Sequence, residues 1–124
     1  MSDDPVRAVR AAVDKTGAAV LLKGATQLVA TPDRPWIDVA LPGPAWTGQA
    51  GSGDVLGGLC ATLLAAGLSA ARAAAVGASV QALTAARHPG PIPPQRLAEL
   101  VPAVIGDLQV QREAQFEEIR RFEW

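Results

Sequence analysis

Tyrosine is absent from this sequence, and other aromatic side chains are scarce: three tryptophans and two phenylalanines bring the aromatic content to only 4%. Alanine, leucine and valine must therefore fill any core, in closely packed layers of small side chains. Hydrophobic residues still make up 49% of the 124 residues, against 19% charged residues, so the chain can bury a core and wholesale disorder is excluded. The length fits one small domain.

Cysteine and net charge are also nearly absent. Cys60 is the single cysteine, so the chain forms no internal disulfide, and its place in an apolar run indicates a packing role. A reducing, cytoplasmic compartment is the expected one. The formal net charge of -1 provides no basic field for a nucleic-acid backbone, so we expect no nucleic-acid partner.

Long apolar runs are missing as well. The apolar stretch over 56–66 falls short of the about 20 residues that a membrane span needs. The N-terminus carries Ser2, Asp3 and Asp4 rather than basic and then apolar residues, so we expect no secretory leader. We therefore expect no membrane partner.

The first predicted element is a helix. Asp4 is a good N-cap, and Pro5 suits the first helical position. Gly17 is placed to end the helix in a left-handed conformation. Apolar residues recur at helical spacing on one face: Val6, Val9 and Val13.

Three short segments then have strand character. Residues 19–22 form a continuous apolar run, which is typical of a strand covered on both faces. Residues 27–31 and 36–39 are predicted as two further strands, separated by a turn over 32–35. We expect the strands to form a hairpin after the first helix.

The second half is predicted to be helical after a long loop. Residues 41–52 are rich in glycine, proline and small side chains, which indicates a loop. A helix follows up to Ala66, with Gly67 as its stop signal, and Ser69 caps an alanine-rich helix over 70–87. The proline-rich segment 88–94 excludes both helix and strand.

The C-terminal end has two predicted parts. Helical periodicity of the aliphatic residues predicts a short helix over 95–100 and another that starts at Pro102. From 110 onward, charged residues alternate with Phe116, Ile119 and Phe122 at steps of three, which indicates an amphipathic helix. We therefore divide the chain into a main domain over 4–109 and a charged tail over 110–124.

The sharpest chemical feature is the segment 50–56, Ala-Gly-Ser-Gly-Asp-Val-Leu, at the start of a predicted helix. Small residues let the backbone N–H groups of Gly51, Ser52 and Gly53 turn toward one point, where the positive end of the helix also attracts an anion. Asp54 lies in the first helical turn, where its carboxylate can accept a proton from a substrate hydroxyl. This pairing suits phosphoryl transfer. A general base typically contributes ~10²–10⁴-fold in rate, or roughly 3–5 kcal/mol of barrier.

The same residues have plainer interpretations. Gly-x-Gly-Asp is a short motif, and aspartate at a helix start is common for stability alone. Lys23, next to Gly24, either binds phosphate or only ends a strand at the surface. For Ser52 we favour a role of the backbone N–H over the hydroxyl, because serine in a glycine loop is often a turn former.

Two segments together resemble the ribokinase-like superfamily, and within it the ADP- or ATP-dependent NAD(P)H-hydrate dehydratases. Residues 50–58, Ala-Gly-Ser-Gly-Asp-Val-Leu-Gly-Gly, resemble the family's anion-hole and base motif, and residues 20–26, Val-Leu-Leu-Lys-Gly-Ala-Thr, are similar to its strand and Lys-Gly loop. The resemblance covers about 4–108. It implies an α/β fold, a truncated ribokinase-like three-layer α/β/α arrangement in which a few strands are followed by several C-terminal helices.

The resemblance implies a role for each matching residue. Asp54 matches the catalytic base that contacts the hydrated nicotinamide, and Gly53 matches a glycine beside the nucleotide. Gly51, Ser52 and Gly53 together match the anion hole. Five loop residues match the contacts to the phosphates and ribose of the nucleotide: Lys23, Gly24, Ala25, Thr26 and Gln27.

The implied reaction is a lyase-type repair of hydrated NADH and NADPH (NADHX and NADPHX). The ring hydroxyl is phosphorylated with ADP or ATP as co-substrate, and phosphate is then eliminated. Mg²⁺ normally accompanies the nucleotide, held largely by phosphate oxygens and water. No dedicated metal cage can be identified in the sequence.

One departure from the family is large. Family members have a long N-terminal part before the Lys-Gly loop, which supplies most of the central sheet and much of the substrate pocket, whereas here one helix precedes the loop. The chain then corresponds to a fragment, a truncated product or one piece of a split enzyme, and its cut sheet edge invites pairing. We expect a homo-oligomer or a chain that supplies the missing N-terminal half.

Two other functions stay open. The first is a small-molecule kinase of the same superfamily, against which the Lys-Gly-Ala-Thr loop argues. The second is a non-catalytic nucleotide-binding or assembly module, which keeps the phosphate-binding turn and has lost turnover.

Overall fold

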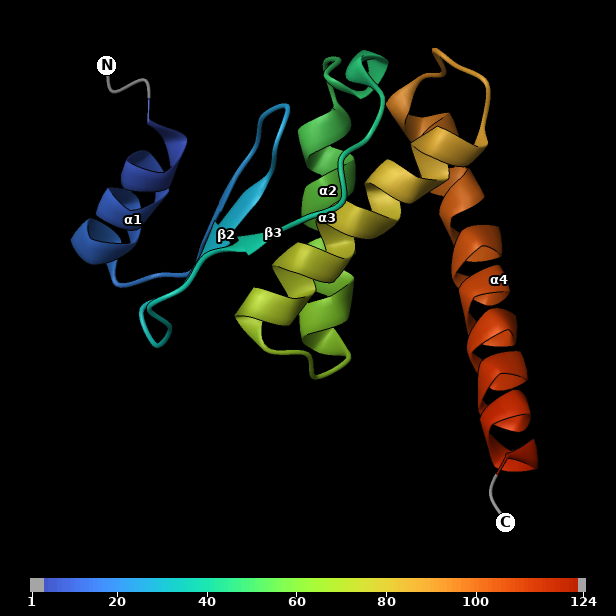
Figure 1. Ribbon diagram of the computed structural model, residues 1–124. Coiled ribbons are helices and arrows are strands. Elements are labelled where there is room, and N and C mark those ends of the chain that lie inside the picture. The colour runs from blue at the N-terminus through green and yellow to red at the C-terminus, as the bar shows by residue number, and fades with distance from the viewer. Residues whose placement is uncertain (1–3, 123–124) are drawn as a thin grey trace.

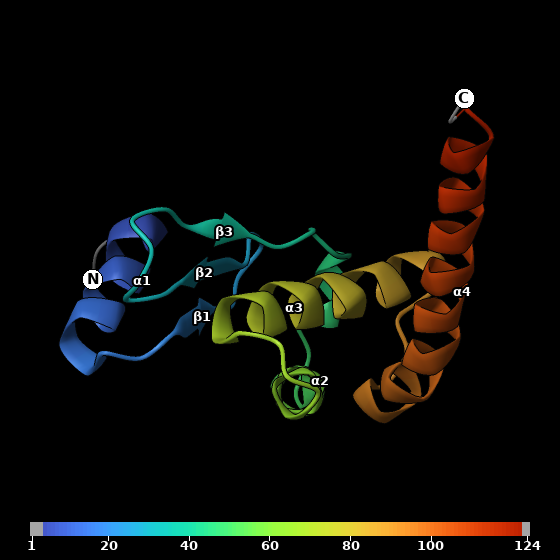
Figure 2. The same cartoon turned by 90° about the horizontal axis from the view of Figure 1, so that it is seen from below.

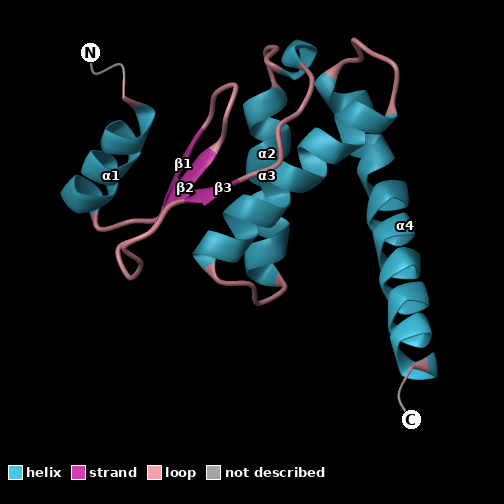
Figure 3. Cartoon of the chain, in the orientation of Figure 1, coloured by secondary structure: helices cyan, strands magenta, loops and turns pink. Residues whose placement is uncertain are grey.

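The computed structural model describes residues 4–122. Figure 1 shows the elements in chain order, and Figure 3 shows the same view by secondary structure. The elements are α1 (Pro5–Thr16), β1 (Val20–Leu22), β2 (Leu28–Ala30), β3 (Asp38–Val39), the 3-10 helix η1 (Ala45–Thr47), α2 (Ser52–Ala65), α3 (Ala70–Arg87) and α4 (Pro94–Arg121).

The sheet lies between helices, so the arrangement has three layers. β1, β2 and β3 are antiparallel neighbours in that order, with Val20 opposite Ala30 and Leu28 opposite Val39. Figure 2 shows α1 on one face of the sheet and α2 and α3 on the other. The predicted α/β class is confirmed, and the layering is that of a truncated ribokinase-like domain.

Two buried clusters fill the spaces between these layers. The cluster between α1 and the sheet consists of Val9, Val13, Leu28 and Ala30. The cluster between the sheet and the α2–α3 pair consists of Ala40, Leu56 and Ala78. Leu21 packs against the second cluster, while Val20 and Leu22 pack against the first. β1 therefore contacts helices on both faces, as predicted, but it is only half-buried because it lies at the edge of the sheet, whereas the central β2 is fully buried.

The ends of α1 follow the predicted signals. The Asp4 side chain accepts hydrogen bonds from two backbone N–H groups of the first turn, and Gly17 ends the helix at φ 68°. Val9 and Val13 are 1% and 2% exposed, as expected for the apolar face. Val6 is 48% exposed, so its assignment to that buried face is wrong. It lies in the first turn of α1, outside the cluster that Val9 and Val13 form with the sheet.

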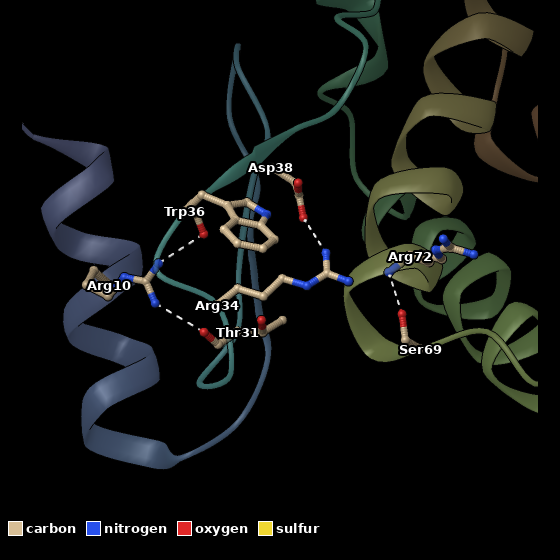
Figure 4. Close-up of polar contacts among 7 residues, drawn as sticks. All are labelled: Arg10, Thr31, Arg34, Trp36, Asp38, Ser69 and Arg72. Carbon is tan, nitrogen blue, oxygen red and sulfur yellow. Dashed lines mark hydrogen bonds and ion pairs between the residues drawn. The ribbon is translucent and has the colours of Figure 1, made fainter.

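A polar clamp holds α1 against the turn between β2 and β3 (Figure 4). The Arg10 guanidinium donates to the backbone carbonyls of Thr31 and Trp36, both at 3.1 Å. Nearby, Arg34 pairs with Asp38 at 3.3 Å and lies over the Trp36 ring, 5.5 Å from its centroid. The clamp fixes the first helix to the hairpin far from the glycine-rich segment.

α2 and α3 pack against each other, and their boundaries lie within one residue of the predicted ones. Gly67, at φ 98°, makes the turn between them, and the Ser69 hydroxyl caps α3 by accepting the Arg72 N–H at 3.3 Å (Figure 4). The two helices approach closely, because a Cβ added to Gly77 of α3 would lie 2.9 Å from the Cys60 sulfur of α2. Gly77 thus sets the spacing of this pair.

α4 is one continuous helix, so the prediction of a break between residues 100 and 102 is wrong. Pro102 lies inside it. Proline removes one backbone N–H and kinks a helix, but its φ is compatible with helical geometry. The buried residues Leu97, Val101 and Val104 continue across the proline on the side that packs against the body of the molecule, and this packing keeps both parts in one helix.

The predicted amphipathic tail is the end of α4, which extends away from the body (Figure 1). Phe116 and Ile119 are 54% and 57% exposed. The helix runs through position 109, so the division into a domain over 4–109 and a tail over 110–124 stays a prediction; residues 123 and 124 lie outside the described part. Within 4–122, no helix combines the length and apolar character required to cross a bilayer.

The packing of α4 gives a test of the fold. Leu97 is 1% exposed, so Leu97→Ala should leave a cavity and lower the free energy of unfolding by about 2–5 kcal/mol. Leu64→Ala, at a position 49% exposed, should lower it by about 1 kcal/mol or less. Urea denaturation followed by circular dichroism measures both; equal losses would mean that α4 does not pack on the body through Leu97.

Candidate functional site

The end of β1 and the start of α2 meet although they are far apart in sequence. The Lys23 ammonium donates to the Ser52 hydroxyl, with Nζ and Oγ 3.1 Å apart. Both segments lie at the same end of the molecule in Figure 1. The structure therefore brings together the Lys-Gly loop and the glycine-rich motif, the two features on which the sequence interpretation rests.

The turn before α2 has the geometry expected of a glycine loop. Gly51 adopts φ 90°, a left-handed conformation that favours glycine. The N–H of Ser52 donates to the carbonyl of Gln49, and the N–H of Asp54 donates to that of Gly51, both at 3.1 Å. Within the described chain, the N–H groups of Gly51 and Gly53 have no protein acceptor. Two of the three predicted anion-hole amides are thus open to a ligand.

Ser52 differs from the expectation. Its backbone N–H closes the turn onto Gln49, so our preference for that N–H as the phosphate donor is wrong. The hydroxyl enters the site instead: it accepts the hydrogen bond from Lys23 and keeps its own O–H proton to donate. Ser52 is only 6% exposed, so this orientation is fixed by its surroundings.

Asp54 is exposed in the first turn of α2. Its carboxylate makes no hydrogen bond or ion pair with another residue among 4–122, and no aliphatic side chains bury it. It lies at the N-terminal, positive end of the helix dipole. The carboxylate is therefore available to a substrate group beside the open amides.

A cavity of about 500 Å³ opens beside the Lys23–Ser52 contact. Its walls come from the Lys-Gly loop, the segment 43–49 that contains η1, Ser52 and the middle of α3. Four of the five predicted loop residues line it: Lys23, Gly24, Ala25 and Gln27. Thr26 is exposed and does not contribute to the wall, and Gly53 lies on the other side of Lys23.

Three glutamines contribute polar side chains to the wall of this cavity. The Oε1 atom of Gln27 is buried and has no hydrogen-bond partner among the described residues. Gln49 donates through Nε2 to the carbonyl of Ile92, and Gln81 donates through Nε2 to the carbonyl of Ser52 at 3.0 Å. Sequence reasoning missed Gln49 and Gln81. Gln81 could have been noticed because it is a long polar side chain on the alanine-rich inner face of α3.

A second cavity, of about 360 Å³, lies on the opposite side of Lys23 between β1, α2 and α3. It is mainly apolar, with Leu21, Leu56 and Cys60 in its wall next to Gly53. Cys60 is half-buried, and this burial raises the pKa of its thiol. Its predicted packing role agrees with its position.

Within residues 4–122, no three histidine, cysteine, aspartate or glutamate side chains come together as a metal cage. Next to the glycine-rich turn, the first turn of α2 contains one acidic side chain, that of Asp54.

Comparison with known protein families identifies a match to most of the chain. The family model described as NAD(P)H-hydrate dehydratase matches residues 1–102. The chain is 49% identical over 93 residues to the bifunctional NAD(P)H-hydrate repair enzyme Nnr of Mycobacterium leprae, a match that covers 72% of the chain and 19% of that protein.

Two further relatives come from other bacteria. The ADP-dependent (S)-NAD(P)H-hydrate dehydratase of Neisseria meningitidis serogroup B is 48% identical over 75 residues, which are 60% of the chain and 25% of that protein. The bifunctional NAD(P)H-hydrate repair enzyme Nnr of Salinibacter ruber is 34% identical over 109 residues, which are 84% of the chain and 20% of that protein. The chain thus spans about a fifth to a quarter of the length of these relatives.

The backbone of the glycine turn can be tested with a matched pair of substitutions. Gly51→Ala forces a side chain into the left-handed region and should lower the free energy of unfolding by about 1–2 kcal/mol. Gly57→Ala, inside α2 with open space at its Cβ, should raise it by about 0.5–1 kcal/mol. Thermal and urea denaturation measure both, and a stabilising Gly51→Ala would contradict the turn geometry.

The raised pKa of Cys60 predicts low thiol reactivity. A raised pKa leaves less thiolate at any pH below it, and the thiolate is the reacting species. At pH 8 the folded chain should react with Ellman's reagent more slowly than the same chain unfolded in urea, and the folded rate should still rise above the pH at which the unfolded rate levels off. Equal rates in the two states would show that the thiol is not shielded.

Proposed function

This chain belongs to the NAD(P)H-hydrate dehydratase family, and we propose that its part in that chemistry is to hold the phosphates of ADP beside the Asp54 carboxylate. The observation that carries the proposal is the 3.1 Å contact between Lys23 and Ser52, at the mouth of the larger cavity. A cation and a hydroxyl with a free proton meet there, and the two open backbone amides of Gly51 and Gly53 flank the same serine. Each of these groups donates to phosphate oxygens.

The proposed reaction uses the groups in sequence. The ring hydroxyl of NADHX or NADPHX attacks the terminal phosphorus of ADP, AMP leaves, and Asp54 accepts the hydroxyl proton. The phosphate ester then loses inorganic phosphate with a ring proton, which restores the double bond of NADH or NADPH. Lys23 and the amides of Gly51 and Gly53 stabilise the negative charge on the phosphoryl oxygens during transfer. The name of the Neisseria relative supports ADP over ATP.

The nucleotide is proposed to lie in the larger cavity. Gln27 faces it with a buried acceptor that lacks a partner, and a ribose hydroxyl or an amino group of the base can donate to it. Mg²⁺ would be held by phosphate oxygens and water, because Asp54 is the only nearby carboxylate in the described chain. When bound, the ion neutralises phosphate charge.

Turnover is proposed to need a second polypeptide. β1 pairs only with β2 among the described residues, so its other edge has unpaired backbone groups. The relatives contain about four to five times the aligned length, and the additional chain is a source of strands for that edge. A strand from another copy, or from a chain that supplies the remaining part of the domain, would complete the sheet. We place the reaction in the cytoplasm.

A non-catalytic binding module is the second candidate. It is favoured by the small share of each relative that the chain spans. The module, like the dehydratase, should bind ADP, but it should not consume NADHX. A turnover assay therefore separates the two candidates. The small-molecule kinase alternative has no support in the names of the relatives.

Nucleotide binding is tested by calorimetry on the full chain. The wild-type protein should bind ADP more tightly than adenosine. Lys23→Met should weaken ADP binding roughly 10–100-fold, because a charge-assisted hydrogen bond contributes about 1.5–3 kcal/mol. Lys15→Met, on the exposed end of α1, is the matched control and should change nothing. Equal affinities for the two variants, or no preference for ADP over adenosine, would refute the proposed site.

Turnover is tested by the recovery of reduced-nicotinamide absorbance from NADHX in the presence of ADP. In any preparation that turns over, Asp54→Asn should lower the rate by about 10²–10⁴-fold while ADP affinity is kept or improved, since a negative charge near the phosphates is removed. ADP binding without any consumption of NADHX would favour the module. A fully active Asp54→Asn variant would exclude Asp54 as the base.

A further inference from the structure

Gln81 is an unusual residue in α3. It is 5% exposed in a helix whose inner face is otherwise mainly alanine. The other buried polar side chain in this helix, Thr84, bonds within the helix to the carbonyl of Val80 at 2.7 Å. Gln81 instead reaches out of its helix and donates to the carbonyl of Ser52, 29 residues earlier in the chain. A buried amide is costly unless it is hydrogen-bonded, so this contact strongly constrains both partners.

The Ser52 end of the contact is held from three directions. The Ser52 carbonyl accepts a hydrogen bond from the Gln81 side chain, and the Ser52 N–H donates to the Gln49 carbonyl. The Ser52 hydroxyl accepts a hydrogen bond from the Lys23 ammonium. The flanking residues Gly51 and Gly53 carry the two open amides. A displacement of the Ser52 backbone would therefore move both amides and the Lys23 ammonium at the same time.

The position of Gln81 relative to Ser52 depends on close helix packing one turn earlier in α3. Gly77 lies four residues before Gln81, directly against Cys60 of α2, where a Cβ would meet the sulfur at 2.9 Å. On another side of α3, a Cβ added to Gly43 would lie 3.1 Å from Ala82. α3 is thus packed closely against both α2 and the segment before η1.

From this geometry we infer that Gln81 is a positioning residue, which fixes the first turn of α2 so that the Gly51 and Gly53 amides and Lys23 converge on one phosphate group. The inference rests on the proposed function for the identity of the ligand, but not for the effect of Gln81 on the turn. Gln81 acts through Ser52, and its influence on a nucleotide should therefore be confined to the phosphates.

The effect on the turn is tested by amide hydrogen exchange in the full chain without ligand. Gln81→Met keeps the length and shape of the side chain and removes the donor. It should speed exchange of the amides in the first turn of α2 by roughly tenfold, the equivalent of one lost buried hydrogen bond. Thr84→Val is the control: it removes a buried hydroxyl from the same helix and should leave that turn unchanged. Should Gln81→Met fail to fold, Gln81→Leu removes the donor with an uncharged side chain of similar volume.

The effect on the ligand is tested by calorimetry with ADP and adenosine. Gln81→Met should weaken ADP binding roughly tenfold and leave adenosine binding unchanged. Its effect should be strongly non-additive with Lys23→Met and additive with Lys15→Met, because only Lys23 shares the Ser52 contact. A general loss of structure would lower the binding of both ligands and would not distinguish the two lysines.

The outcomes separate the two proposals. Unchanged exchange in the first turn of α2, or equal effects of Gln81→Met and Thr84→Val, overturns the role of Gln81. Faster exchange in Gln81→Met with no ADP binding by the wild-type chain supports the positioning role and refutes the proposed ligand. Faster exchange with weaker ADP binding supports both.

Discussion

The hydrogen bond between the Lys23 ammonium and the Ser52 hydroxyl joins the two segments on which the site depends. One segment ends an edge strand and supplies the ammonium, and the other begins a helix and supplies the open amides, so the complete site needs both. The three-layer packing holds them together: α1 and the Arg10 clamp fix the hairpin, and α3 holds the start of α2 through Gln81. The site is thus a consequence of how the layers stack, with the larger cavity between them.

Local signals in the sequence were sufficient for most of the helices and strands. Asp4, Gly17, Gly67 and Ser69 act within one or two turns of the chain, and their caps and stops are found where they were predicted. Pro102 was misjudged because a proline signals a break locally, whereas the packing of Leu97, Val101 and Val104 is a long-range property that overrides it. Amino-acid composition and periodicity contain no information on such long-range packing.

The site could be predicted only in part, because local motifs are visible in the sequence and long-range contacts are not. Glycine and aspartate in the 51–54 segment are a local motif, so its position at a helix start could be inferred. The occupation of the Ser52 N–H by Gln49 depends on the path of the whole preceding loop, and the contact of Gln81 with Ser52 depends on the register of α2 against α3. Neither can be derived from spacing along the chain. Family membership supports the proposed dehydratase chemistry, and turnover is left to experiment because the chain spans only about a fifth to a quarter of each relative.

The central claim is that two unoccupied backbone amides at the start of α2 are a phosphate-binding site. Amide chemical shifts of the ¹⁵N-labelled chain, followed by NMR during titration with inorganic phosphate and with ADP, report on this claim directly. The account predicts that the Gly51 and Gly53 amide protons move downfield with both ligands and stay in place with adenosine. Shifts that spare both glycines while other residues respond would contradict it.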